Sequence, residues 1–482
     1  MIIEKFKNSV KANPIRICVT DKKDYTYQDI YNLAIYVCEY IGKQRLMQDE
    51  GIGLIMPNNA FYVATILGCY MAGHPVILID QNIKQYELIQ FIKKLYIRHL
   101  LIYDPLIPNY NSKNNRIEKI ERINSSFIEI GQAHNTVFSK GDFICQFTSG
   151  TNGLSKACIR TEEAVFNEII KTKNMLDIVE KDHFLILPPI HHSYGLIAGV
   201  LLPLCYGCRI QFIDQFIPAD VLKILNNKQV NILFAVPFMY KILIDSLIKM
   251  IAIKKDEYNF DHLKYCFSAG ALLDPELASL FTSLFNQHIY NDYGSTESGI
   301  ICLNIDDHNG AAGIPVDYTI DIVDEHGQIL QVGQIGKILL SGKSLFRKYA
   351  ISNSTYDSDV LNGKWLTGDI GYKDQRGYVY VKGRANHMIN ISGCKVDPVE
   401  VENALLKYPG ITQAVVVGIE KEFMDQYLKA FIVIDRSIKK KDIYAFCKKL
   451  LTDYKVPRVI QIVDEIPRTQ TGKIIKKNLL NL

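Results

Sequence analysis

The segment FTSGTNGLSKACIR runs from Phe147 to Arg160 and follows the apolar run Phe143-Ile144-Cys145. Within nine positions it gathers hydroxyl side chains, glycines and one lysine: Thr148, Ser149, Gly150, Thr151, Gly153, Ser155 and Lys156. Hydroxyls and glycine-exposed backbone amides can donate hydrogen bonds to phosphoryl oxygens, and a lysine supplies positive charge. The segment therefore has the chemistry of a phosphate-binding loop, although a polar surface loop after a strand has a similar composition. Its spacing is not G-x-x-x-x-G-K-[ST], so it does not indicate a helix-anchored triphosphate site.

Apolar runs rich in strand-forming residues lie on both sides of this segment. They cover residues 53–56, 75–79, 99–103, 184–187, 210–213 and 232–236, and helical patterns such as 60–71 and 86–95 separate most of them. Thr26 is typical of a helix cap, because apolar residues follow it at the spacing of an amphipathic helix. Alternation of this kind predicts an α/β fold with largely parallel sheets buried on both faces.

The chain of 482 residues is long enough for two or more domains. Short strands around the turn Asp324-Glu-His-Gly327, continuing through residues 337–340, predict a small antiparallel β unit. After Gly383-Arg384 the pattern changes to a compact tail with two helical segments. We therefore place a boundary near residue 385, between an N-terminal domain of residues 1–384 and a small C-terminal α+β domain of residues 385–482.

Composition restricts the classes of partner and compartment. The formal net charge is only +4 and is spread along the chain, so no nucleic-acid partner is expected. The N-terminus lacks the apolar core of a signal peptide, and no apolar run reaches membrane-spanning length. The eleven cysteines are scattered, which fits reduced thiols and a cytoplasmic protein. Cys205 and Cys208 have no second pair at ligand spacing, which argues against a metal site.

Three further clusters carry polar chemistry. Residues 187–195, LPPIHHSYG, place two histidines and a tyrosine after a strand, where open α/β folds bind ligands. In residues 291–297, NDYGSTE, Tyr293 can stack on a flat base, Thr296 can donate to a phosphate, and Glu297 can hold Mg²⁺. In residues 365–369, WLTGD, the carboxylate of Asp369 can accept both ribose hydroxyls. Taken singly, each cluster also fits ordinary structure, such as a buried histidine or a surface carboxylate.

Together these clusters resemble the signatures of the adenylate-forming (AMP-binding) superfamily, which contains acyl- and aryl-CoA ligases, peptide-synthetase adenylation domains and beetle luciferases. The loop resembles T-S-G-[ST]-T-G-x-P-K-G, with departures that affect its stiffness at Asn152, Ser155 and Ala157. P-x-x-H-x-x-G occurs at 189–195, Y-G-x-T-E at 293–297 and T-G-D at 367–369. Residues 467–474, PRTQTGKI, resemble P-[KR]-T-x-x-G-K-[IL]. The motifs follow the family order across nearly all of the chain.

The resemblance implies a role for each matching residue. The ATP-binding residues would be Thr148, Ser149, Gly150, Thr151, Lys156, Gly270, Ala271, Asp292, Tyr293, Gly294, Asp369 and Arg384. The catalytic group would be His192, Thr296, Glu297 and Lys473, with Glu297 as the Mg²⁺ ligand. Asn386 would be the hinge of a mobile C-terminal lid, and Gly393 would line the pantetheine channel of CoA.

The acid pocket would include Ser193, Tyr194 and Gly299. Amino-acid-activating relatives usually carry Asp at the place of Ser193 to pair with the α-ammonium group. A serine cannot neutralise a buried ammonium group. The resemblance therefore disfavours an α-amino acid and favours an aryl or fatty acid with an uncharged tail.

The activity implied is that of an AMP-forming acid–thiol ligase of the acyl- or aryl-CoA synthetase type, using ATP, Mg²⁺ and CoA. A carboxylic acid would be activated as acyl-AMP with release of pyrophosphate, and the acyl group would then pass to the thiol of CoA. The alternative is a stand-alone adenylation enzyme that loads the phosphopantetheine of a carrier protein. A degenerate binding module would lack catalytic residues, yet Lys473, Glu297 and Asp369 are all present. An acyl kinase would release ADP, and the loop spacing argues against it.

Overall fold

The computed structural model describes residues 1–480 except residues 45, 84, 110–115, 121–124, 130–135, 149–155, 255–257, 272, 307, 309, 352–362, 385–388, 392–393, 397, 422–423, 452 and 470–473. The chain forms two compact units, one of residues 1–320 and 340–365 and the other of residues 321–339 and 366–482. The chain therefore passes between the units more than once before residue 385. The domain boundary that we predicted near residue 385 stays a prediction.

The first unit contains a nine-stranded sheet in the order β16-β15-β14-β13-β12-β10-β11-β1-β2. The inner strands pair in parallel, in the order β14, β13, β12, β10, β11 and β1. The outer pairs are antiparallel. The strands are β1 (Ile17–Thr20), β2 (Asp24–Thr26), β10 (His183–Ile186), β11 (Arg209–Gln211), β12 (Ile232–Ala235), β13 (Tyr265–Ala269), β14 (Ile289–Ser295), β15 (Gly299–Asn304) and β16 (Ile314–Pro315).

The same unit contains an eight-stranded sheet in the order β19-β9-β8-β4-β3-β5-β7-β6. Its central strands β8, β4, β3 and β5 pair in parallel, and its edges are antiparallel. The strands are β3 (Ile52–Ile55), β4 (Val76–Ile79), β5 (His99–Tyr103), β6 (Arg116–Ile120), β7 (Ser125–Glu129), β8 (Asp142–Phe147), β9 (Ala157–Thr161) and β19 (Lys348–Ile351). The predicted α/β class with largely parallel sheets is confirmed.

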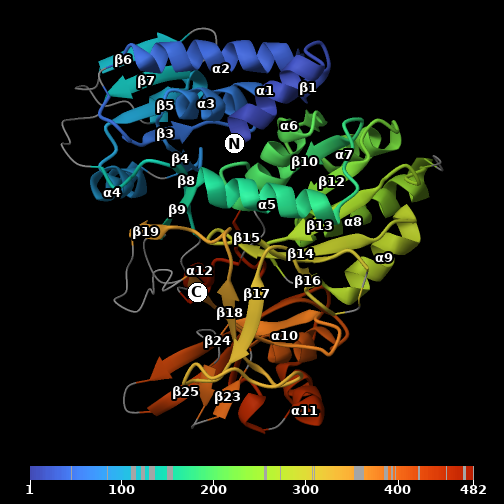
Figure 1. The fold of residues 1–482 in the computed structure, drawn as a ribbon. Coiled ribbons are helices and arrows are strands. Elements are labelled where there is room, and N and C mark those ends of the chain that lie inside the picture. Colours follow the sequence, from blue (N-terminus) through green and yellow to red (C-terminus); the bar gives the residue numbers. More distant parts are fainter. Residues whose placement is uncertain are drawn as a thin grey trace. The chain divides into compact units, whose positions relative to one another are not determined.

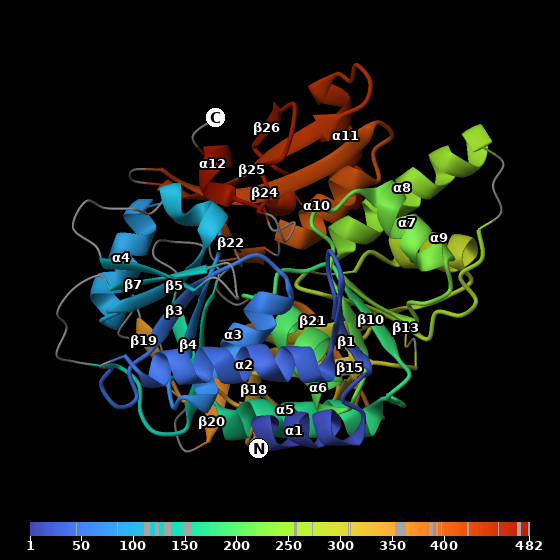
Figure 2. The same ribbon diagram turned by 90° about the horizontal axis from the view of Figure 1, so that it is seen from above.

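Helices cover both sheets (Figure 1). One core joins the facing sides of the sheets and includes α1 (Ile2–Ala12), α2 (Tyr27–Gly42), α3 (Ala60–Met71), α5 (Glu162–Met175), the π-helix η3 (Tyr194–Leu201) and α6 (Leu202–Cys205). Figure 2 shows α3 between the strands of the two sheets. A second core packs α7 (Pro218–Asn226), α8 (Pro237–Lys254) and α9 (Pro275–Phe285) on the nine-stranded sheet. A third packs α4 (Gln85–Leu95) on the eight-stranded sheet.

Local sequence explains these elements. Thr26 caps α2 as predicted: its side chain accepts from the backbone of Asp29, whose carboxylate in turn accepts from the backbone of Thr26. Ile30, Ala34, Val37 and Ile41 then bury one stripe of the helix. Strands such as β3, β4 and β10 are buried at every position, because helices cover both of their faces. No helix in the described part of the chain is long and apolar enough to cross a membrane.

The second unit holds most of a four-stranded sheet in the order β17-β18-β20-β21. Its strands are β17 (Thr319–Val323), β18 (Gly336–Ser341), β20 (Lys364–Lys373) and β21 (Val379–Arg384). The predicted turn after Val323 is present: Asp324 N donates to Gln328 O at 3.0 Å, and Gly327 adopts φ +83°. Beyond it lie β22 (Ile389–Ile391), β23 (Cys394–Val396), α10 (Pro398–Leu406), β24 (Ile411–Lys421), β25 (Met424–Ile434), α11 (Lys440–Leu450), β26 (Val459–Ile462) and α12 (Lys476–Leu480). This tail is α+β, as predicted.

Candidate active site

The predicted phosphate loop connects β8 to β9, which form an antiparallel hairpin. At the two ends of the loop, Thr148 N donates to Lys156 O at 2.9 Å, so the hairpin holds these ends together. The ammonium group of Lys156 lies 4.7 Å from the ring centroid of Tyr349 on β19, a cation–π distance. Ser149, Gly150 and Thr151 lie outside the described residues, and their phosphate-binding role stays a prediction.

Glu297 lies in the turn between β14 and β15, beside this hairpin. Its carboxylate is 9% exposed, and its Oε1 accepts a hydrogen bond from the hydroxyl of Tyr349 at 2.8 Å. Its backbone carbonyl accepts from Phe346 N at 2.7 Å. The carbonyl of the neighbouring Thr296 accepts from the thiol of Cys158 on β9 at 3.6 Å. The structure thus brings Lys156, Thr296 and Glu297 together, and their catalytic and nucleotide-binding roles stay predictions.

This donor set fits Mg²⁺ that arrives with a nucleotide. No group of three or more histidine, cysteine, aspartate or glutamate side chains that could hold a metal occurs among the described residues. Mg²⁺ commonly keeps several waters and is held by one or two carboxylates together with substrate phosphates. The single carboxylate of Glu297 matches that mode, and no protein cage for a permanently bound metal is required.

The candidate adenine-binding residues lie at the carboxyl ends of β13 and β14. These strands pair in parallel with Ala269 opposite Asp292, so Gly270, which follows β13, lies beside Tyr293, which continues β14 and pairs with Cys302 of β15. Gly270 adopts φ +84°, and a Cβ there would have no neighbour within 4 Å. Together with the exposed Ala271 it leaves open space above the backbone. Gly294 is required for packing, because a Cβ there would lie 2.4 Å from the carbonyl oxygen of Gly299.

The histidine motif follows β10. Asn58, after β3, donates to Pro188 O at 3.0 Å and accepts from Ile190 N at 2.9 Å, so it ties this loop to the other sheet. Gly195 permits the turn into η3, since a Cβ there would lie 2.5 Å from Pro189 O.

The rings of His191 and His192 lie 4.2 Å apart, and only His192 is partly exposed. Burial lowers the pKa of His191 to about 4, so this ring is neutral near pH 7. Ser193 is buried, and its hydroxyl has no hydrogen-bond partner among the described residues. The hydroxyl of Tyr194 donates to Ala235 O at 3.2 Å.

A small cavity of about 10 Å³, room for about one water molecule, lies between α5, η3 and the nine-stranded sheet. Its lining is almost entirely apolar and includes Ala198, Phe234, Phe267 and Ile300, with the carboxyl group of Asp292 on one wall. Burial holds the pKa of Asp292 well above its ordinary value, and the charge of Glu168 adds to this shift. Burial therefore favours the protonated, uncharged form of Asp292.

Two sequence predictions take on a different meaning here. Asp292 was predicted to bind the nucleotide, whereas its side chain lines this cavity. Gly299 was predicted to widen the acid pocket, whereas the space beside it holds Glu168: a Cβ there would lie 1.9 Å from the Glu168 carboxylate. The nucleotide role of Asp292 and the pocket role of Gly299 stay predictions.

Asp369 and Arg384 lie together in the second unit. They face each other across the antiparallel pair of β20 and β21, and Arg384 Nε donates to Asp369 Oδ1 at 3.1 Å. Asp369 N donates to the hydroxyl of Thr367 at 2.9 Å, and Gly368 adopts φ +77°. Asp369 is 7% exposed, whereas the side chain of Arg384 is 50% exposed. Asn386, Gly393 and Lys473 lie outside the described residues.

The contacts of Tyr349 with Glu297 and Lys156 have no signal in the sequence. Tyr349 is 52 positions from Glu297 and belongs to no motif, so only the pairing of β19 with β9 reveals that it contacts both Glu297 and Lys156. Sequence analysis also gave no role to Arg160, which is the largest fully buried side chain in the described part of the chain.

Known proteins share both the sequence and the fold. A family model described as AMP-binding enzyme matches residues 6–350, and one described as AMP-binding enzyme C-terminal domain matches residues 400–473. The mitochondrial acyl-coenzyme A synthetase ACSM3 of Rattus norvegicus is 29% identical over 352 residues, and the chain spans about 60% of its length. A 2-succinylbenzoate–CoA ligase of Oceanobacillus iheyensis is 27% identical over 469 residues, covering 95% of this chain and 94% of the relative.

Solved structures agree on the fold. o-Succinylbenzoate CoA synthetase of Bacillus subtilis, in complex with its acyl-adenylate intermediate, superposes with a TM-score of 0.83 at 21% identity, covering 98% of this chain and 97% of that chain. ATP-bound MatB of Rhodopseudomonas palustris gives a TM-score of 0.84 at 20% identity, with coverages of 99% and 98%.

Proposed function

Because the chain belongs to the AMP-binding enzyme family, we propose that it activates a carboxylic acid with ATP and transfers the acyl group to the thiol of CoA. The observation that carries this proposal is the grouping of Lys156, Tyr349 and Glu297 at the start of β9. This grouping puts a cation and a carboxylate together where β9 begins. The printed activities of the relatives, acyl-coenzyme A synthetase and 2-succinylbenzoate–CoA ligase, support the same reaction.

In the first step, a carboxylate oxygen of the acid attacks the α-phosphorus of ATP. A new oxygen–phosphorus bond forms as the bond to pyrophosphate breaks, which gives acyl-AMP and pyrophosphate. This reaction needs alignment and charge neutralisation more than covalent help. Lys156, Lys473 and the loop hydroxyls would bind phosphoryl oxygens, and Thr296 would donate to the α-phosphate. Glu297 would hold Mg²⁺, which neutralises negative charge on the phosphates when it is bound.

The rest of the nucleotide would be held by separate groups. Tyr293 and the open backbone at Gly270 suit the two faces of the adenine ring. Asp369 would accept the ribose hydroxyls, with Arg384 held beside it at 3.1 Å to contact ribose or phosphate. In the second step the thiol of CoA would attack the acyl carbon and AMP would leave. We propose that the C-terminal domain turns about Asn386 between these steps and presents Gly393 to the pantetheine arm.

The proposed substrate is an aryl or fatty acid with an uncharged tail. His192 would border the carboxylate, and Ser193 and Tyr194 would line the pocket that receives the tail. Ser193 offers no charge for an α-ammonium group. Burial raises the pKa of Asp292 and so favours its protonated form, which would donate a hydrogen bond to a polar substituent without requiring a cation.

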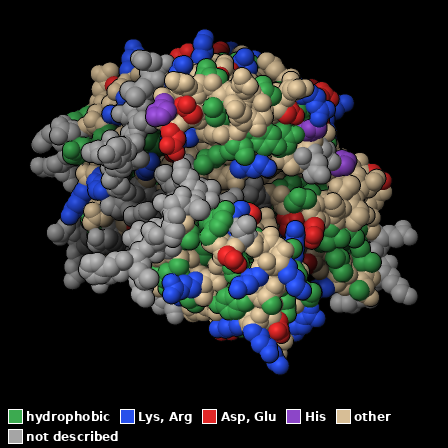
Figure 3. Space-filling view, turned by 90° about the horizontal axis from the view of Figure 1, so that it is seen from below, with side chains coloured by type: hydrophobic (Ala, Val, Ile, Leu, Met, Phe, Trp, Pro, Cys, Tyr) green, Lys and Arg blue, Asp and Glu red, His purple; other side chains and the backbone are tan. Residues whose placement is uncertain are grey.

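A carrier protein is the alternative acceptor of the acyl group. Helix α11 and the residue before it expose Lys439, Lys440, Lys441, Lys448 and Lys449. Figure 3 shows lysine and arginine side chains on the lower part of the face drawn there. A positive surface suits the phosphates of CoA and equally suits an acidic carrier domain. The ten cysteines for which a state is described are free, which supports a reducing compartment, and we propose the cytoplasm.

The test is exchange of labelled pyrophosphate into ATP, run without CoA on a panel of aryl, fatty and α-amino acids. We expect exchange with one aryl or fatty class and none with the amino acids. Exchange that depends on an α-amino acid would overturn the substrate assignment. Absence of exchange across the panel, with folded protein that binds ATP, would contradict acid activation in these classes. Adding free CoA to the active acid then separates the acceptors, because turnover without a carrier protein identifies CoA.

A further inference from the structure

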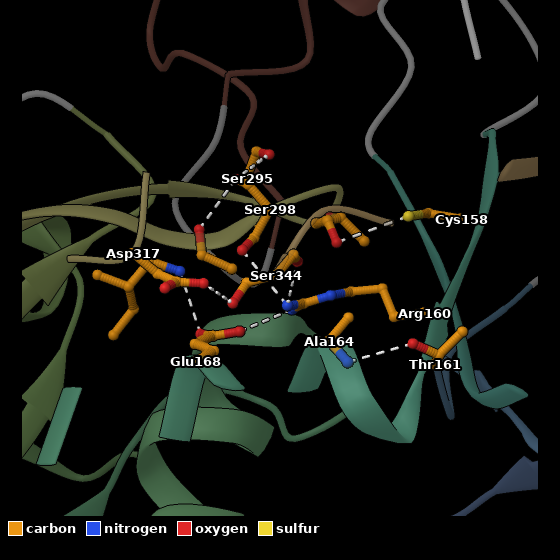
Figure 4. Close-up of polar contacts among 12 residues, drawn as sticks. Cys158, Arg160, Thr161, Ala164, Glu168, Ser295, Ser298, Asp317 and Ser344 are labelled. Carbon is orange, nitrogen blue, oxygen red and sulfur yellow. Dashed lines mark hydrogen bonds and ion pairs between the residues drawn. The ribbon is translucent and has the colours of Figure 1, made fainter. Parts of the chain in front are cut away.

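Arg160 and Glu168 form an ion pair inside the first unit. Arg160 lies on β9, four residues after Lys156, and Glu168 lies on α5. Arg160 Nη1 and Glu168 Oε2 are 2.8 Å apart, and the two side chains are 0% and 3% exposed. Charged side chains are almost never buried this completely unless they are paired. Figure 4 shows the two side chains meeting between the helix and the turn that carries Ser298.

One further polar atom of each partner holds the chain that follows Glu297. Arg160 Nη2 donates to Ser298 O at 3.3 Å, and Glu168 Oε1 accepts from Ile300 N at 3.1 Å. Between them Gly299 adopts φ +67°, where only a glycine leaves room for the carboxylate. The pair therefore contacts both backbone groups that flank Gly299, immediately after the proposed metal ligand.

The pair also holds the second segment that contacts Glu297. Arg160 Nη2 donates to Ser344 O at 2.9 Å, and the Ser344 hydroxyl donates to Asp317 at 2.6 Å. Two residues further on, Phe346 N donates to Glu297 O, and Tyr349 then reaches the Glu297 carboxylate. One guanidinium group thus joins the two segments between which the Glu297 side chain is held.

A purely stabilising role does not require charge at this place. Well-packed apolar residues of similar volume often replace a buried ion pair without loss of stability, because burying the two charges is itself costly. Apolar side chains cannot, however, donate to two carbonyl groups on different segments and accept from Ile300 N. The contacts that only the charged pair can make are the ones that fix the position of residues 298–300 and 344.

We propose that Arg160 and Glu168 are positioning residues that fix the Glu297 carboxylate for the metal–nucleotide complex. The inference rests on the proposed function, since it takes Glu297 as the ligand of Mg²⁺. It predicts that the pair controls the affinity for metal-bound ATP more than the affinity for AMP, which needs no metal.

The test uses the full chain with both charges replaced, Arg160→Met with Glu168→Met, so that no unpaired charge is left inside. Binding of Mn²⁺–ATP and of AMP is measured by calorimetry without acid, and thermal unfolding is followed in parallel. We expect about tenfold weaker Mn²⁺–ATP binding, the order of effect of one lost contact to a charged group, with AMP affinity changed less than about threefold. If the double variant does not fold, Glu168→Gln, which keeps the side-chain shape, is measured in its place with the same expectation.

Glu50→Gln is the matched control, because Glu50 is also buried, at 1% exposure. Its Oε1 lies 2.6 Å from Nδ1 of His99, and none of the contacts described for Glu50 involves Glu297. It should lower thermal stability and leave Mn²⁺–ATP affinity unchanged. Unchanged Mn²⁺–ATP affinity in the folded double variant would overturn the positioning role. Glu297→Gln separates the two proposals. If it weakens Mn²⁺–ATP binding and the double variant does not, only this inference fails. If it has no effect, the metal role of Glu297 fails, and this inference fails with it.

Discussion

The hydroxyl of Tyr349 donates a hydrogen bond to Oε1 of Glu297 across 2.8 Å, while the ring of the same tyrosine lies 4.7 Å from the ammonium group of Lys156. One aromatic side chain therefore contacts the proposed metal ligand through its hydroxyl and the proposed phosphate-binding lysine through its ring. Tyr349 can do both because β19 pairs with β9, with Tyr349 opposite Cys158. The ring is also supported by Phe346, whose centroid lies 4.6 Å away.

Tyr349→Phe should weaken the use of ATP without disturbing the fold. The ring contacts with Lys156 and Phe346 remain, and the hydrogen bond to a charged oxygen is lost, which is worth about 1.5–3 kcal/mol. We expect the KM for MgATP in pyrophosphate exchange to rise about tenfold or more, with the KM for the acid unchanged.

Tyr27→Phe is the control for that experiment. Tyr27 lies on α2, and its hydroxyl donates to Cys208 O at 2.8 Å and does not contact Glu297. It should lower the unfolding temperature and leave the KM for MgATP as it was. Equal changes in the KM for MgATP in both variants would mean that loss of stability alone explains the effect.

Gly270→Ala tests the open space above the ends of β13 and β14. Gly270 and Gly73 share a positive φ, +84° and +89°, and a Cβ at either would meet nothing within 4 Å. Each alanine should therefore cost a similar backbone strain, about 1 kcal/mol. Only Gly270→Ala should also raise the Kd for AMP, because its methyl group enters the space proposed for adenine. An equal Kd for AMP in the two variants would mean that adenine binds elsewhere.

Lys473→Ala separates the two half-reactions. We expect loss of acid-dependent pyrophosphate exchange, because Lys473 is the proposed charge partner of the phosphates, whereas thioester formation from supplied acyl-AMP should persist. Lys407→Ala, an exposed lysine on the same domain, is the control and should affect neither step. Equal loss of both half-reactions in Lys473→Ala would count against its assignment to adenylation.

The repeated pattern of apolar runs and helical segments was enough to predict the α/β class, because buried parallel strands and amphipathic helices leave local signatures. The capping residue Thr26 and the turn after Val323 are likewise local and were predicted correctly. The return of residues 340–365 to the first unit was not predictable in the same way. β19 joins β9 although 191 positions separate Tyr349 from Cys158, and such a pairing depends on tertiary packing, for which a short segment carries no signal.

The motifs located Lys156, Thr296 and Glu297 but could not show what holds them. Arg160 stands in an apolar strand, and its partner Glu168 lies on the following helix, so no helical or strand spacing relates them. Gly299 illustrates the same limit. A glycine in a sequence indicates that a side chain is not tolerated, but only the structure shows that the Glu168 carboxylate occupies the space.

Asp292→Asn tests whether the apolar cavity carries a charge. Burial raises the pKa of Asp292 above the value of 3.8 that an unperturbed aspartate has. Between the lower pKa of Asp292 in the unfolded chain and its higher pKa in the folded chain, the unfolded chain binds fewer protons than the folded chain. The stability of the wild type therefore falls as the pH rises through this interval. Asparagine binds no proton and lacks this dependence. Relative to the wild type, the free energy of unfolding of Asp292→Asn should therefore increase as the pH rises above the ordinary pKa of an aspartate.

The measurement is urea unfolding of both proteins at several pH values, with Asp324→Asn as a control of opposite sign. Asp324 is exposed, and hydrogen bonds from the backbone of Gln328 and His326 lower the pKa of its carboxyl group. Its stabilising effect is present above the unfolded pKa and is lost as the pH falls, so this variant should be less stable than the wild type near neutral pH. A difference between Asp292→Asn and the wild type that does not change with pH would mean that Asp292 is already ionised. A buried negative charge at Asp292 would then favour an acid with a cationic group, and the proposed preference for an uncharged acid would be wrong.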